Sequence, residues 1–165
     1  MKIAEAALSV GTPISWSADW AWSLPLIILT LLVHVVGLLL IAEIAKRFLN
    51  GVTQGHSYPV VFTGIVGGTS LSVTLLLAID GMIWAVAYLL VGALPDTNSA
   101  VLYSLSALTA YGHANLDLER RWQLMGAMEA LNGMLLFGLT TAFLFGTLQK
   151  TWELRGRRAT SRRAA

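Results

Sequence analysis

Three long apolar segments, separated by short polar stretches, dominate the pattern along the chain. They cover residues 24–44, 59–94 and 122–149. A membrane-spanning helix needs about 20 consecutive apolar residues, because the hydrocarbon core of a bilayer is about 30 Å thick. The pattern therefore predicts an all-α membrane protein with three transmembrane helices, preceded by an interfacial lead-in over residues 1–23.

The second apolar segment is longer than one bilayer crossing requires. Its roughly 35 residues would extend about 52 Å as a helix, against a hydrocarbon core of about 30 Å. We expect one long or kinked helix, with Gly67-Gly68 and Asp80-Gly81 as the places where a break would fall. The alternative is two separate spans, which would need a turn at Asp80-Gly81 with almost no loop.

The stretch over residues 97–116, between the second and third segments, is too short and too polar to be another span. Asp96, Thr97, Asn98 and Ser99 are candidate N-caps for a helix of about 12 residues, which would be about 18 Å long. Residues 110–114, if extended, would return about 16 Å. These lengths predict a re-entrant loop, and the partial negative charge at the end of its half-helix would favour a cation. The alternative is a short helix on the outer surface.

Basic residues follow the first and third segments. Lys46 and Arg47 stand in the loop over residues 45–58, and six basic residues stand in the tail over residues 150–165. Because cytoplasmic loops of membrane proteins carry an excess of Lys and Arg, we expect both stretches in the cytoplasm and the N-terminus outside. The tail can also bind anionic lipid headgroups, or it can simply fix the orientation.

The composition agrees with a membrane domain. Hydrophobic residues make up 56% of the 165 residues and charged residues 12%, whereas soluble domains carry about 25% charged residues. The absence of cysteine excludes disulfides and thiol chemistry. No HExxH-type metal spacing occurs, and Asp80 and Glu129 are the only candidates for an intramembrane enzyme. We therefore expect no enzymatic activity, no cofactor and no nucleic-acid partner.

Three short motifs give the chain a family resemblance. Asp80 is followed by Trp84-Ala85 and Tyr88, residues 104–115 read SLSALTAYGHAN, and residues 128–138 read MEALNGMLLFG. In these motifs the chain resembles bacterial potassium-channel-like proteins, whose pore helix reads like SLVTFTTLGYGD and whose last span reads like LEALNGLLLFG. The resemblance covers a little under half of the chain and is strongest in the last span.

The resemblance implies a pore domain over residues 59–149, with an outer helix (59–94), a pore helix and filter (97–116) and an inner helix (122–149). It also implies a homotetramer, since one loop supplies only one wall of a central pore, and a place in the inner membrane of a bacterial cell. Potassium or other monovalent cations would then pass along rings of backbone carbonyls.

The selectivity filter that the resemblance implies departs from the family pattern. It consists of Thr109, Ala110, Tyr111, Gly112, His113, Ala114 and Asn115. Ala114 stands where the family has a glycine, so it disfavours the usual backbone geometry. Ala110 removes a hydroxyl, and His113 replaces a tyrosine ring with a group that titrates near pH 6.5. We expect weakened or altered selectivity, and the alternative is a non-conducting or regulatory membrane subunit.

Four further residues within the apolar segments suggest supporting roles. Glu129 would brace the back of the filter, or it would be a hydrogen-bonded packing group; Asp80 is the second candidate for filter support, with packing as its simpler interpretation. Gly133 and Gly138 would serve as hinges of the inner helix, or would allow close packing. His34, in the first segment, is expected to form hydrogen bonds with a neighbouring helix.

Overall fold

The structure, a computed structural model, describes residues 17–51, 58–112, 116 and 118–164. Within this part of the chain every regular element is a helix. They are α2 (Ser17–Gly51), α3 (Tyr58–Leu90), α4 (Thr97–Leu108), the short 3₁₀ helix η1 (Arg120–Trp122) and α5 (Gln123–Ala164).

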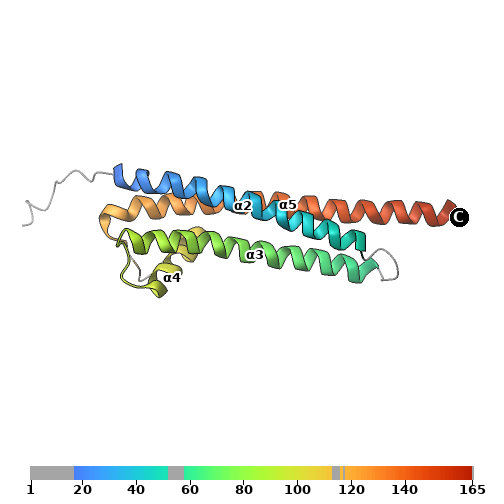
Figure 1. The fold of residues 1–165 in the computed structure, drawn as a ribbon, viewed down its shortest axis with the longest axis horizontal. Coiled ribbons are helices and arrows are strands. Elements are labelled where there is room, and N and C mark those ends of the chain that lie inside the picture. Colours follow the sequence, from blue (N-terminus) through green and yellow to red (C-terminus); the bar gives the residue numbers. More distant parts are fainter. Residues whose placement is uncertain (1–16, 52–57, 113–115, 117, 165) are drawn as a thin grey trace, which may run out of the picture.

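The three long helices form an elongated bundle (Figure 1). Helices α2 and α5 run in the same direction and α3 runs in the opposite one, while α4 lies near the end where α3 finishes and α5 begins. Apolar stretches over Ser17–Phe48, Val60–Leu90 and Arg120–Lys150 are long enough to cross a membrane. The expectation of three helices that are long and apolar enough to span a membrane is therefore confirmed.

Helix boundaries differ from the expected ones at both ends of the chain. Helix α2 begins at Ser17 and continues through Pro25, so it includes residues that we placed in the lead-in. The carboxylate of Asp19 explains this extension, because it is buried and accepts a hydrogen bond from the Met125 N–H at 3.0 Å. Asp19 thus caps the first turn of α5 from another helix.

The other two long helices, α3 and α5, also continue through positions where the sequence suggested a break or an end. Helix α3 is unbroken from Tyr58 to Leu90, so Gly67-Gly68 and Asp80-Gly81 are not break points. Helix α5 continues to Ala164 through the basic segment that we treated as a separate tail. Lys and Arg are good helix formers, which is consistent with this continuation.

The buried apolar core is divided into two clusters. The larger one surrounds Trp84, Tyr88 and Met125, near the end of the bundle where α4 lies. The smaller one, around Leu38, Val73 and Leu76, lies further along the long helices. Between them the interior holds several fully buried polar side chains, and these residues make up the candidate site.

Candidate functional site

The N-terminus of α4 is fixed by Asp96, the first of the four N-cap candidates over residues 96–99. One carboxylate oxygen accepts the Ser99 N–H at 2.9 Å, and the other accepts the Ser99 hydroxyl at 2.7 Å. The hydrogen bond from the Ser99 backbone, followed by that from its side chain, holds the pKa of the Asp96 carboxyl below its usual value. An N-cap of this kind satisfies one of the free N–H groups in the first turn of the helix.

A buried hydrogen-bond cluster joins the middle of α4 to α3 and α5. Glu129 of α5 is fully buried; its Oε2 accepts the Tyr88 hydroxyl at 2.6 Å, and its Oε1 lies 2.5 Å from the Ser104 hydroxyl oxygen. The Ser104 oxygen also lies 2.6 Å from the Gly81 carbonyl oxygen of α3. Tyr88 and Tyr103 meet edge to face with ring centroids 5.2 Å apart. Glu129 therefore links all three helices.

The C-terminus of α4 ends in a Schellman motif. The Tyr111 N–H donates to the Ser106 carbonyl, and the Ala110 N–H donates to the Ala107 carbonyl, both at 2.9 Å. This motif needs a left-handed residue after the helix, which is usually glycine. Here Ala110 fills the position with a φ of 53°, at a steric cost of about 1–2 kcal/mol.

Helix α5 approaches the end of α4 at a glycine. A Cβ atom added to Gly133 would collide with the backbone carbonyl of Leu108. The last carbonyl of α4 therefore rests directly on α5, which gives Gly133 a packing role. Its hinge role stays a prediction. Gly138, the second hinge candidate, has no heavy atom within 4 Å of an added Cβ.

The described half of the predicted filter lies after α4. Thr109, Ala110, Tyr111 and Gly112 are exposed in the single chain, and the Tyr111 side chain is 86% accessible. The Thr109 hydroxyl donates to the Leu105 carbonyl at 2.8 Å, so it is bonded to the last turn of α4. Gly112 has a φ of 77°. The predicted filter residues His113, Ala114 and Asn115 lie outside the described residues.

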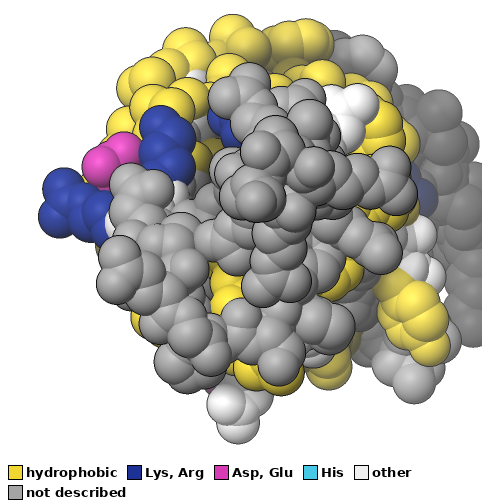
Figure 2. Space-filling model, turned by 90° about the vertical axis from the view of Figure 1, so that its right-hand side faces the viewer, with side chains coloured by type: hydrophobic (Ala, Val, Ile, Leu, Met, Phe, Trp, Pro, Cys, Tyr) yellow, Lys and Arg dark blue, Asp and Glu magenta, His cyan; other side chains and the backbone are white. Residues whose placement is uncertain are grey.

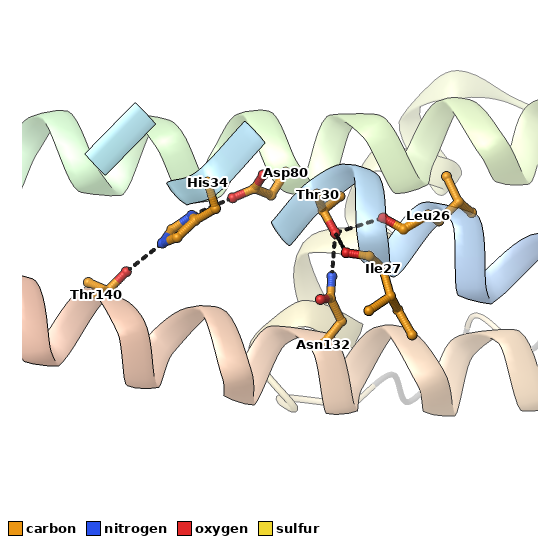
Figure 3. Close-up of polar contacts among 7 residues, drawn as sticks. All are labelled: Leu26, Ile27, Thr30, His34, Asp80, Asn132 and Thr140. Carbon is orange, nitrogen blue, oxygen red and sulfur yellow. Dashed lines mark hydrogen bonds and ion pairs between the residues drawn. The ribbon is translucent and has the colours of Figure 1, made fainter. Parts of the chain in front are cut away.

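A second buried polar layer joins α2 to the other two long helices (Figure 3). His34 is fully buried; its Nδ1 lies 2.7 Å from Asp80 Oδ2, and its Nε2 lies 3.1 Å from Thr140 Oγ1. About one helical turn away, the Asn132 amide donates to the Thr30 hydroxyl at 2.8 Å. The expectation that His34 bonds to neighbouring helices is thus confirmed.

The structure separates two acids that the sequence grouped as filter support. Glu129 contacts α4 directly, whereas the carboxylate of Asp80 bonds to His34 of α2. Only the neighbour of Asp80, Gly81, reaches α4 through its carbonyl group. Asp80 therefore belongs to the contact between α2 and α3, which agrees with the packing interpretation.

Sequence reasoning missed several partners in this region. Ser104 and Tyr88 were visible only as parts of motifs, and nothing in the pattern assigned them to Glu129. Asp80 as the partner of His34 was also missed, because the two residues are 46 positions apart. Among the described residues, no group of three or more His, Asp or Glu side chains is arranged to hold a metal ion.

Fold and site together define a bundle of three helices that are long and apolar enough to cross a membrane, with a short, capped helix held between α3 and α5. No protein-family model matches the chain, and neither a curated protein nor a solved structure matches it.

Proposed function

We propose that this protein is a subunit of a homotetrameric cation channel. The observation that carries the proposal is α4, a 12-residue helix held between two membrane-spanning helices. Its length of about 18 Å is just over half of a hydrocarbon core of about 30 Å. A short helix followed by irregular backbone is tolerated at membrane depth only where protein buries it or where it lines a water-filled path.

The electrostatics of α4 favour a cation at its C-terminal end. The last carbonyls of a helix carry partial negative charge. In this chain the end of α4 leads into the exposed residues Thr109–Gly112, which would form the described part of the filter. The remaining filter residues, His113, Ala114 and Asn115, would complete the loop as the sequence predicts.

The contacts of the last-span motif support the resemblance to pore-loop channels. Within MEALNGMLLFG, Glu129 bonds to α4, Asn132 bonds to α2, and Gly133 lets the end of α4 pack closely against α5. These three motif residues therefore hold the surrounding helices in place. In a channel, α3 would be the outer helix, α4 the pore helix and α5 the inner helix.

A tetramer would explain the exposed surface near the loop. One loop supplies one wall, so a central ring of carbonyls needs several copies of the chain. Tyr111 is 86% accessible in the single chain, and a neighbouring subunit would cover part of this ring. The altered filter favours potassium or other monovalent cations with weakened selectivity. Positive charge would place the N-terminus outside and the C-terminus in the cytoplasm of a bacterial cell.

Ion flux into liposomes tests the proposal. The purified protein is reconstituted with potassium, and then sodium, as the only permeant ion, and its tetrameric state is checked by native mass spectrometry. We expect flux of at least one ion. Absence of flux for both ions from an intact tetramer would refute conduction by this chain alone.

Single cysteines would locate the path, since the chain has none of its own. We expect a charged thiol reagent to block flux through Tyr111→Cys. The matched control is Leu71→Cys, which is also exposed but lies on α3. Equal block of both variants, or block of neither, would contradict a pore formed by the loop after α4.

The second candidate function is a non-conducting or regulatory subunit that assembles with another channel chain. The left-handed Ala110 favours it, because this position would strain a regular filter. We infer no enzymatic role, since the acids Asp80 and Glu129 are engaged in bonds between helices.

A further inference from the structure

A groove lies between α2 and α5 in the half of the bundle away from α4. It has a volume of about 520 Å³ and is lined mainly by apolar side chains. Val35, Leu39 and Ala42 line it from α2, Leu139 and Phe143 line it from α5, and α3 contributes Ile65. Val35 and Leu39 are exposed in the structure, so the groove faces the surroundings of the bundle.

The length of the groove matches one leaflet of a bilayer. On α2 it extends from Val35 to Lys46, and on α5 from Leu139 to Lys150. Each interval is eleven residues, which corresponds to about 16 Å of helix. Half of the hydrocarbon core is about 15 Å. Because α2 and α5 run in the same direction, both lysines lie at the same end of the groove (Figure 1).

The charge at this end of the groove is positive. Glu43 lies 3.7 Å from Lys46 and 3.4 Å from Arg47, so one carboxylate is shared by two cations. Lys150 forms no ion pair within the part of the chain that the structure describes. Figure 2, which looks onto this end, shows basic side chains beside hydrophobic ones. Among the side chains that the structure describes here, Lys46, Arg47 and Lys150 with Glu43 leave an excess of two positive charges.

We propose that this groove binds one anionic phospholipid from the leaflet on the lysine side. An acyl chain would lie along the apolar lining, and the headgroup phosphate would lie between the Lys46 and Lys150 ammonium groups. Charge complementarity favours this occupant, since the cytoplasmic leaflet supplies anionic headgroups where positive-inside residues gather. The proposal needs only that the bundle crosses a membrane, so it does not depend on ion conduction.

The test is lipid binding by the purified, delipidated full-length protein, followed by native mass spectrometry. Phosphatidylglycerol and phosphatidylcholine with identical acyl chains are the probes. We expect phosphatidylglycerol to bind more tightly, and Lys46→Gln with Lys150→Gln to reduce that preference about thirtyfold, or about fivefold per lysine. The matched control is Arg47→Gln, a neighbouring cation that does not line the groove. An equal loss in Arg47→Gln would mean diffuse surface attraction and would overturn the proposal.

A second variant tests the apolar part without touching charge. Gly146 lines the groove, and an added Cβ meets no heavy atom within 4 Å, so the side chain of Gly146→Leu would start in open space and extend into the groove. We expect it to weaken binding of phosphatidylglycerol at least tenfold. The control is Gly67→Leu, which has similar free space on α3. Unchanged binding in Gly146→Leu would overturn the proposal. Full competition by inorganic phosphate would also overturn the proposal. So would the finding that Gly146→Leu dissociates an assembly of copies of this chain and leaves lipid binding unchanged.

Discussion

The buried cluster around Glu129 allows a sharp prediction about its protonation and its contribution to stability. The Ser104 hydroxyl carries one proton but lies within 2.6 Å of two acceptors, the Gly81 carbonyl and Glu129 Oε1. One proton cannot serve both short contacts. We therefore expect the second proton to come from the Glu129 carboxyl, while the Tyr88 hydroxyl donates to its other oxygen.

This hydrogen count predicts different costs for two substitutions at the same site. Glu129→Gln keeps an acceptor for Tyr88 and supplies an N–H donor for Ser104, so it should cost less than about 1 kcal/mol. Glu129→Ala leaves the buried Tyr88 hydroxyl without a partner and opens a cavity. An unsatisfied buried group costs about 1–3 kcal/mol and lost packing adds to this. We expect a total loss of about 3 kcal/mol.

The assay is reversible unfolding in mixed detergent micelles, followed by circular dichroism. Met134→Ala is the control, because this side chain is on α5 but is 56% exposed. Tyr88→Phe should cost about 1 kcal/mol, the value of one hydrogen bond. If Glu129→Gln destabilises the protein as much as Glu129→Ala does, the carboxylate must be ionised and the reasoning from the hydrogen count is refuted.

Three further predictions follow from the ends of α4. Gly133→Ala should lower the free energy of unfolding by about 2 kcal/mol or more, because its Cβ would push against the Leu108 carbonyl. Gly138→Ala, the control, should change the free energy of unfolding by less than about 0.5 kcal/mol. Equal effects of the two substitutions would contradict the close contact at Gly133. Ala110→Gly should stabilise the protein by about 1 kcal/mol in the same unfolding assay, since glycine accepts the left-handed conformation; a loss of stability would show that Ala110 is not strained. The hydrogen-exchange protection of the Ser99 amide should be constant at neutral pH and fall only as the pH drops through the lowered pKa of Asp96. The reason is that a carboxyl with a lowered pKa contributes its full stabilisation at pH values above its usual pKa of 3.8. Asp96→Asn should abolish this pH dependence.

Much of the architecture could be predicted from local patterns. The three apolar runs are long enough to predict three long apolar helices, and the N-cap candidates over residues 96–99 predict the start of α4, because an N-cap acts within one turn. Boundaries were less accurate at Asp19, since its capping partner is the Met125 N–H of a different helix. No local pattern could indicate that contact.

The sequence predicted individual residues of the candidate site, but it could not identify their partners on other helices. Glu129 stood out because an acid in an apolar segment needs a partner, but the sequence did not identify Tyr88 or Ser104 as those partners. The sequence grouped Asp80 with Glu129, but it could not indicate that Asp80 bonds to His34 of α2, whereas Glu129 contacts Ser104 of α4. From the sequence, Ala110 was interpreted only as the loss of a hydroxyl group from the filter. Its left-handed backbone was not foreseen, because glycine usually occupies that position.

The polar contacts of α2 constrain how α5 could move if the protein opens and closes as a channel. Helix α5 is bonded to α2 at Asn132 and again at Thr140. Both predicted hinges, Gly133 and Gly138, lie between these two contacts, so a bend at either glycine must carry α2 along or break a buried hydrogen bond. Gly146 lies beyond Thr140, where an added Cβ meets no neighbour. A bend there would break neither bond, so movement of the C-terminal end of α5 would cost least beyond Thr140.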